Sequence, residues 1–133
     1  MAETLTARVW REQPQRYRLL AYRDTKTGIV YFPPRLVAPG DLKANFEEVS
    51  LQEGTGTVVA YTVIRVAPTP HADLAPYALA IIQTEQGVKL TAQVADVDIE
   101  EVKIGMKVRF EFRRIFESNE ASAIYYGYKA VPV

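Results

Sequence analysis

Few side chains in this 133-residue chain could carry out chemistry. It has one histidine, His71, and no cysteine, which excludes a disulfide, a thiolate metal site and a cysteine nucleophile. No nucleophile elbow, phosphate-binding loop or zinc-protease motif is found in the sequence. His71 lies in a proline-rich stretch, where it could contact a ligand or be an exposed loop residue. Acidic residues at 96–101 fit a helix start and a solvated face. The sequence therefore argues against an enzyme acting alone.

Two predicted turns, at 24–28 and 38–41, organise the first third of the chain. The first has Asp and Thr side chains that can bond local amides, and the second contains Pro-Gly. Residues 29–32 are β-branched and aromatic, which favours a short strand, and two prolines end it. This layout is that of a zinc ribbon, in which two turns surround one tetrahedral metal.

The positions that match the four zinc ligands hold no sulfur. They are Asp24, Thr27, Ala38 and Asp41. Two carboxylates and a threonine are a poor set for a hard cation, so we expect no zinc and no metal here. The hairpin must then be held by packing, and the candidate side chains are Ile29, Tyr31, Phe32 and Val37.

The composition is that of an ordinary globular protein, with 48% hydrophobic and 24% charged residues. No apolar run approaches the length of a membrane span, and the N-terminus lacks a signal peptide, so a cytoplasmic protein is expected. Residues 1–46 hold eight Lys or Arg against four Asp or Glu, whereas 47–133 hold eight against twelve. The basic front indicates either an acidic partner or a solvated face.

The segment before the first turn predicts a short helix over 7–13, capped by Thr6 and ended by Pro14, and then a strand over 17–23. Trp10 is a large anchor that could pack on its own domain or on a partner protein. Residues 42–49 are expected to link this part to a β-rich part.

The β-rich part predicts five strands and one helical turn at 98–102. The strands are expected at 57–66, 77–84, 88–94, 108–115 and 123–131. Five strands of this length, with a helical turn between the third and fourth, favour an OB-fold barrel. The expected fold is mainly β: a five-stranded OB-fold barrel preceded by a short N-terminal helix and a degenerate zinc-ribbon hairpin.

The run Thr-Lys-Thr-Gly-Ile-Val-Tyr-Phe-Pro-Pro-Arg, followed by Ala-Pro-Gly-Asp, resembles the rubredoxin-like ribbon of the zinc-ribbon/OB-fold acyl-CoA-associated proteins. The later Tyr-Thr-Val-Ile, Ala-Pro-Tyr and Ile-Gly-Met-Lys-Val segments fit the same family. The resemblance covers nearly the whole chain and implies a helix at 1–16, a metal-free ribbon at 17–45 and an OB-fold domain at 46–133. The loss of all four cysteines is the departure from the family.

The resemblance implies a non-catalytic accessory subunit of a thiolase, a 3-hydroxy-3-methylglutaryl-CoA synthase or another acyl-CoA enzyme. Coenzyme A or acyl-CoA is the implied ligand, with Arg35 and Arg65 for its phosphates and Tyr61 and Tyr77 beside its pantetheine arm. The implied partner contacts are Trp10, Tyr31 and Phe32.

Two alternatives remain open. An OB-fold could bind single-stranded nucleic acid on its tyrosines, although the acidic barrel disfavours phosphate binding. A small enzyme acting on acyl-CoA alone is disfavoured by the shortage of nucleophiles.

Overall fold

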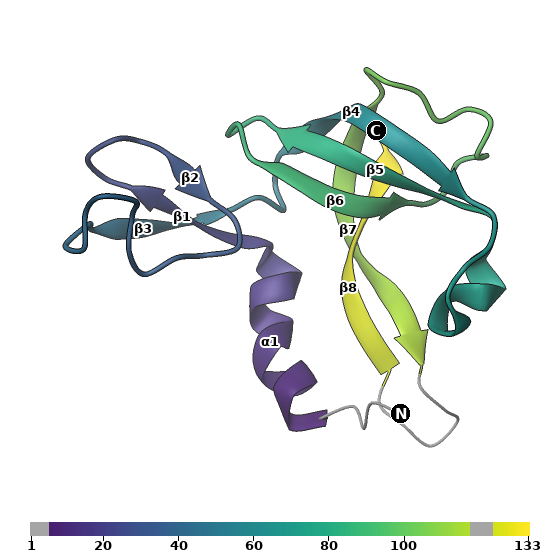
Figure 1. Cartoon of the computed structure of the whole chain (residues 1–133), viewed down its shortest axis with the longest axis horizontal. Helices are drawn as coiled ribbons and strands as arrows, with labels where there is room; N and C mark the ends of the chain where they lie inside the picture. The colour runs from purple at the N-terminus through teal and green to yellow at the C-terminus, as the bar shows by residue number, and fades with distance from the viewer. Residues whose placement is uncertain (1–5, 118–123) are drawn as a thin grey trace.

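The computed structural model describes residues 6–117 and 124–133 and shows a barrel, a small three-stranded sheet and one helix (Figure 1). Within the described residues, no helix is long and apolar enough to cross a bilayer. In chain order, the elements are α1 (Thr6–Arg18), β1 (Leu20–Asp24), β2 (Val30–Tyr31), β3 (Phe46–Ser50), β4 (Thr55–Ile64), η1 (Thr69–Leu74), β5 (Tyr77–Thr84), β6 (Lys89–Val94), β7 (Lys107–Glu117) and β8 (Ile124–Pro132).

Five strands close into a barrel in the order β4-β5-β6-β8-β7, and β7 pairs back with β4. All neighbours are antiparallel except β6 and β8, which run parallel. This order confirms the predicted OB-fold, and each barrel strand lies within two residues of its expected bounds. Alternation of apolar and polar residues located β6, because one of its faces packs into the barrel, and apolar runs bounded by turn residues located the other strands.

The barrel core consists of apolar side chains from all five strands. The largest fully buried ones include Val58, Ile82 and Val108, and Phe110 is also buried. Gly56 lies where β4 meets both β5 and β7. A Cβ added there would overlap Ile82 Cγ2, so the close approach of the strands requires glycine.

A second sheet precedes the barrel and has the order β2-β1-β3. We call residues 20–50 the ribbon. Its third strand was not predicted: 46–50 was expected to lie in a link, but it pairs along the whole of β1. The placement of a domain boundary at residue 45 stays a prediction, although the sheet of the ribbon extends to Ser50.

Helix α1 continues past the point where it was predicted to end. Pro14 lies inside it, and residues 17 and 18, predicted to open a strand, form its last turn. The prolyl ring removes one helical hydrogen bond, but the final turn is anchored by packing: the Tyr17 ring lies 5.3 Å from that of Phe112 in β7, edge to face. The helix ends at Arg18, and the next residue, Leu19, has a positive φ of 48° and is fully buried.

Two of the described loops between barrel strands also differ from expectation. Residues 98–102 form a hydrogen-bonded turn, with the Glu101 amide donating to the Asp98 carbonyl over 2.9 Å, and not a helical turn. The helical turn lies instead at η1, in the loop that holds His71. Pro68 precedes η1 and a proline lies in its first turn, where a missing amide costs no helical bond.

Candidate functional site

The two turns of the ribbon are built by side chains that accept amide hydrogen bonds two residues ahead. Asp24 Oδ1 accepts from the Lys26 amide at 2.9 Å, and Asp41 Oδ1 accepts from the Lys43 amide at 3.0 Å. Thr27 Oγ1 accepts from the Ile29 amide at 3.3 Å. Three of the four positions that match zinc ligands therefore shape their turns through oxygen atoms.

Lys26 connects the two turns. Its amide binds Asp24 in the first turn, and its Nζ lies 3.2 Å from Asp41 Oδ2 in the second. The Lys43 amide and Lys26 together lower the pKa of Asp41, because both stabilise the carboxylate. Among the described residues, no group of three or more His, Cys, Asp or Glu could hold a metal ion. An ammonium–carboxylate contact thus lies between the turns.

One face of the ribbon carries half-buried aromatic rings. Tyr22 stacks on Phe46 at 6.0 Å, and Tyr31 meets Phe46 edge to face at 6.1 Å. Arg35 lies 5.2 Å above the Tyr31 ring, as a cation–π contact. Packing by Tyr31 is therefore as predicted, and Phe46 is the partner that sequence reasoning missed because 46–50 was not expected to form a strand.

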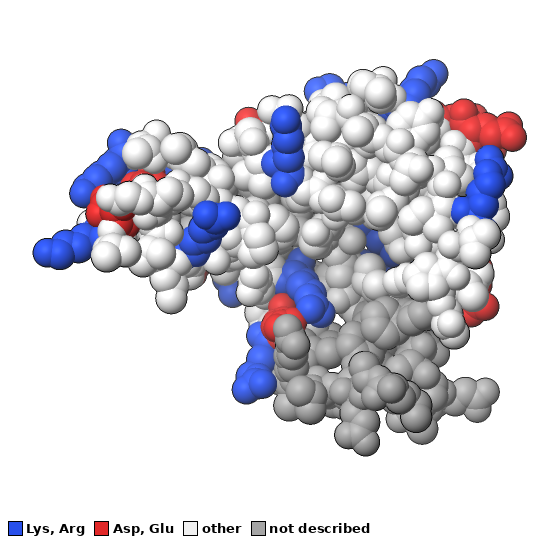
Figure 2. Space-filling view, in the orientation of Figure 1, with Lys and Arg blue, Asp and Glu red and all other residues white. Residues whose placement is uncertain are grey.

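Other apolar side chains of the ribbon remain exposed. Ile29 and Val37, which were predicted to hold the hairpin, are 51% and 47% exposed. Leu36 and Leu42 are each 83% exposed, and Val37 and Leu42 flank the bridge between residues 38 and 41. We call these four residues the aliphatic tip. Figure 2 shows basic and acidic side chains mingled on this part of the molecule.

Helix, ribbon and barrel meet at one joint. Leu19 and Leu51 are fully buried there, and the Leu51 amide donates to the Leu19 carbonyl over 3.1 Å. The Ser50 hydroxyl donates to the Arg18 carbonyl over 2.6 Å, which satisfies the helix end. The Phe32 ring packs edge to face on Tyr128 of β8 at 6.0 Å. Within this chain, Phe32 therefore joins the ribbon to the barrel.

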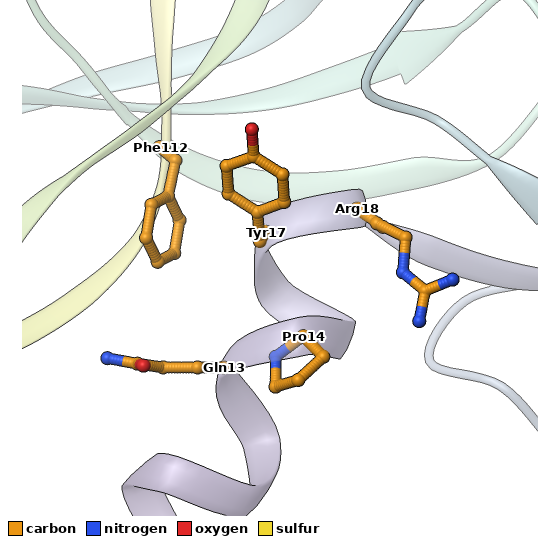
Figure 3. A pocket seen from close by; sticks show the side chains of 5 residues that line it. All are labelled: Gln13, Pro14, Tyr17, Arg18 and Phe112. Atoms are coloured by element: carbon orange, nitrogen blue, oxygen red, sulfur yellow. The ribbon is translucent and has the colours of Figure 1, made fainter.

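A groove of about 530 Å³ lies in the angle between α1 and the barrel (Figure 3). Its lining residues are Gln13, Pro14, Tyr17, Arg18 and Phe112. Phe112 also stacks on Tyr126 of β8 at 5.5 Å, which extends the aromatic surface. The wall is thus largely apolar, with a guanidinium and an amide as its polar groups, which suits an amphipathic ligand.

None of the predicted acyl-CoA residues lines this groove. Arg35 is in the ribbon, whereas Arg65 follows β4 at the opposite end of the barrel (Figure 1). Tyr61 is 43% exposed on β4, and Tyr77 is half-buried with its ring 6.2 Å from that of His71. Their roles stay predictions. The groove was missed because Tyr17 was assigned to a strand, which hid its pairing with Phe112.

Three predicted partner contacts have different positions. Trp10 belongs to α1, but its side chain lies outside the described residues. Tyr31 and Phe32 are half-buried by the contacts above, within the chain itself. Their predicted role at a protein interface is not tested by these contacts.

Similar proteins place the chain in a family. A family model described as the C-terminal OB-fold domain of ChsH2 matches residues 49–113. The chain is 41% identical over 134 residues to a "DUF35 domain-containing scaffold protein" of Methanocaldococcus jannaschii, which covers 100% of this chain and 94% of that protein. It is 37% identical to proteins of the same description from Methanothermobacter thermautotrophicus and Pyrococcus furiosus, covering 97% and 96% of this chain and 97% and 92% of theirs.

A solved structure shares the whole architecture. It is described as "Ltp2-ChsH2(DUF35) aldolase", and the match has a TM-score of 0.68 at 21% identity, covering 99% of this chain and 98% of that one. At this identity the likeness concerns the fold. Together with the full-length relatives, it confirms the resemblance to the OB-fold acyl-CoA-associated proteins. The chain therefore belongs to the DUF35 domain-containing scaffold proteins.

Proposed function

We propose that this protein is a non-catalytic scaffold subunit that docks on a thiolase-superfamily or related acyl-CoA enzyme and helps bind or transfer acyl-CoA. The partner supplies the catalytic groups. The aliphatic tip carries this proposal, because a small sheet that leaves four aliphatic side chains in water favours a covering surface. Full-length similarity to proteins described as scaffolds supports the same role.

The groove supports the ligand part of the proposal. Tyr17 and Phe112 offer an apolar surface for an acyl or pantetheine chain, and Arg18 offers a positive charge at its side. A ligand held there would contact both the helix and the barrel. The nucleic-acid alternative has less support. Tyr128 is desolvated and Tyr77 is half-buried, and the exposed Tyr61 and Tyr126 lie on a barrel with more acidic than basic residues, which disfavours phosphate binding.

A pull-down tests the docking. The tagged protein is recovered from its native cells at moderate salt, and bound proteins are identified by mass spectrometry. We expect an acyl-CoA enzyme in stoichiometric amount, and we expect its recovery to persist at higher salt because an apolar interface is little screened. Recovery of nucleic acid that falls steeply with salt would contradict the proposal.

A matched pair of variants locates the surface. Leu36→Ser with Leu42→Ser should abolish enzyme recovery, since both side chains are exposed and contribute little to folding. Val66→Ser is the control: it is 92% exposed but follows β4, on the barrel. Equal recovery by the double variant and the wild type would exclude the aliphatic tip as the docking surface.

A further inference from the structure

Helix α1 carries more positive charge than its own contacts neutralise. Its sequence contains four arginines and one carboxylate, that of Glu12. Glu12 binds Arg16 at 2.6 Å, whereas the structure gives the guanidinium groups of Arg11 and Arg18 no hydrogen bond or ion pair with any described residue. Figure 2 shows basic side chains over α1, below the ribbon. The helix therefore presents positive charge to its surroundings.

Arg11 and Arg18 lie on one exposed face of α1. Together with Gln15 they are spaced by four and three residues, which places them along one side of a helix, and all three are exposed. At a rise of about 1.5 Å per residue, the two arginines are about 10 Å apart along the axis. The helix packs on the barrel through another side, where Tyr17 meets Phe112. We call Arg11, Gln15 and Arg18 the basic face.

The stability of α1 accounts for only part of this charge. A cation in the last turn is favoured by the helix macrodipole, which explains Arg16 and Arg18. Arg11 lies in the middle of the helix, where this effect is absent because it is confined to the end turns. The charge of Arg11 is thus available for an interaction outside the chain.

The negative charge that would cover the basic face must come from another molecule. Among the described residues, the exposed carboxylates of Asp98, Glu100 and Glu101 lie in the loop after β6, at the far side of the barrel from α1 (Figure 1). Nucleic acid is a poor match, because the acidic excess in residues 47–133 would repel its phosphates. A folded acidic surface fits better, since it can place carboxylates opposite both arginines without a long polyanion.

We propose that the basic face of α1 docks on an acidic surface of the partner enzyme and speeds its association. This inference rests on the proposed function, because it requires that enzyme. Exposed ion pairs add little affinity, but complementary charges raise the association rate and restrict the choice of partner. The basic face selects and orients the enzyme, and the aliphatic tip holds it.

The test measures association and dissociation rates between the ligand-free protein and the enzyme identified by the pull-down, at low and high ionic strength. Arg11→Gln with Arg18→Gln should slow association about fivefold at low ionic strength and leave dissociation within about twofold. The difference should shrink at high ionic strength, because salt screens exposed charges. Lys89→Gln with Lys103→Gln is the matched control: it also removes two exposed cations, on the barrel, and should slow association less than about twofold.

The outcomes separate this docking from the scaffold function. An arginine variant that associates as fast as wild type, or equal slowing in both double variants, overturns the docking of the basic face and leaves the scaffold function intact. Recovery of no acyl-CoA enzyme overturns both. Arginine-dependent self-association in sedimentation velocity, or arginine-dependent binding of single-stranded RNA, overturns the enzyme as the occupant. Far-UV circular dichroism should show an unchanged helix, since glutamine and arginine have similar helix propensities.

Discussion

The barrel and the ribbon achieve stability in different ways. The barrel closes its hydrogen bonds on itself and buries apolar side chains from every strand. The ribbon has three short strands, three half-buried aromatic rings on one face, and turns built by Asp24, Thr27 and Asp41. Its aliphatic tip remains exposed, since a sheet of this size cannot cover it. The ribbon is thus the part for which a partner surface would add most.

The turns of the ribbon are held without a metal. In a zinc ribbon the metal fixes both turns at once. Here each turn is fixed by its own side-chain oxygen, and the two are connected by Lys26 and Asp41 at an exposed position. An exposed ion pair is weak. The ribbon is also held by its aromatic packing, by Phe32 on the barrel, and by Ala21, Val30 and Val49, which belong to or pack against the buried core.

The largest expected difference between the regions concerns aromatic truncation. Phe110→Ala should cost about 3–5 kcal/mol of unfolding free energy, because the ring is fully buried and would leave a cavity. Phe46→Ala should cost about 1–2 kcal/mol, because its ring is half-buried between Tyr22 and Tyr31. Urea unfolding at neutral pH measures both. Equal losses would show that the ribbon is as tightly packed as the barrel.

Substitution of one glycine in the barrel and one in the ribbon should also affect stability differently. Gly56→Ala should cost about 1–3 kcal/mol, since its Cβ would press on Ile82 and on the backbone oxygen of residue 83. Gly28→Ala should cost about 1 kcal/mol, because its φ is +76° although no atom lies within 4 Å. Thermal unfolding of both variants checks this order. A Gly56→Ala protein as stable as wild type would contradict the close approach of β4 and β5.

The smallest expected effect is on the stability of the ribbon at acidic pH. The pKa of Asp41 is below its ordinary value of 3.8, so its contribution to stability is present above pH 3.8 and lost as the pH falls through the lower, folded value. Asp41→Asn should therefore be less stable than wild type at pH 7, with the difference vanishing at lower pH. Urea unfolding across this range measures it.

The barrel offers the matched control for this acid effect. Hydrogen bonds from Thr55 lower the pKa of Glu85, whose ordinary value is 4.5, so Glu85→Gln should show the same sign. The pH at which the NMR signals of the folded ribbon disappear should change in Asp41→Asn and stay unchanged in Glu85→Gln. A response of the ribbon to both would mean that the two regions unfold as one unit.

Sequence reasoning succeeded where local patterns and burial agree. The nearly continuous apolar run at 77–84 located β5 at its observed bounds, and the turn chemistry of Asp24 and Gly28 located the first turn. It failed where distant contacts override local preference. Pro14 predicts a helix end. However, α1 continues because Tyr17 packs on Phe112, almost a hundred positions later in the chain. Likewise, 46–50 forms a strand because β1 offers it an open edge.

The sequence alone thus determined the class of fold, the two turns and the absence of cysteine chemistry, because these depend on residue type and short spacing. Tertiary structure alone decided which side chains meet. It placed Phe112 against Tyr17 in the groove, and it paired Arg113 of β7 with Asp96, which follows β6. Both arrangements depend on strand order and register, which bring together residues whose contact no local pattern encodes.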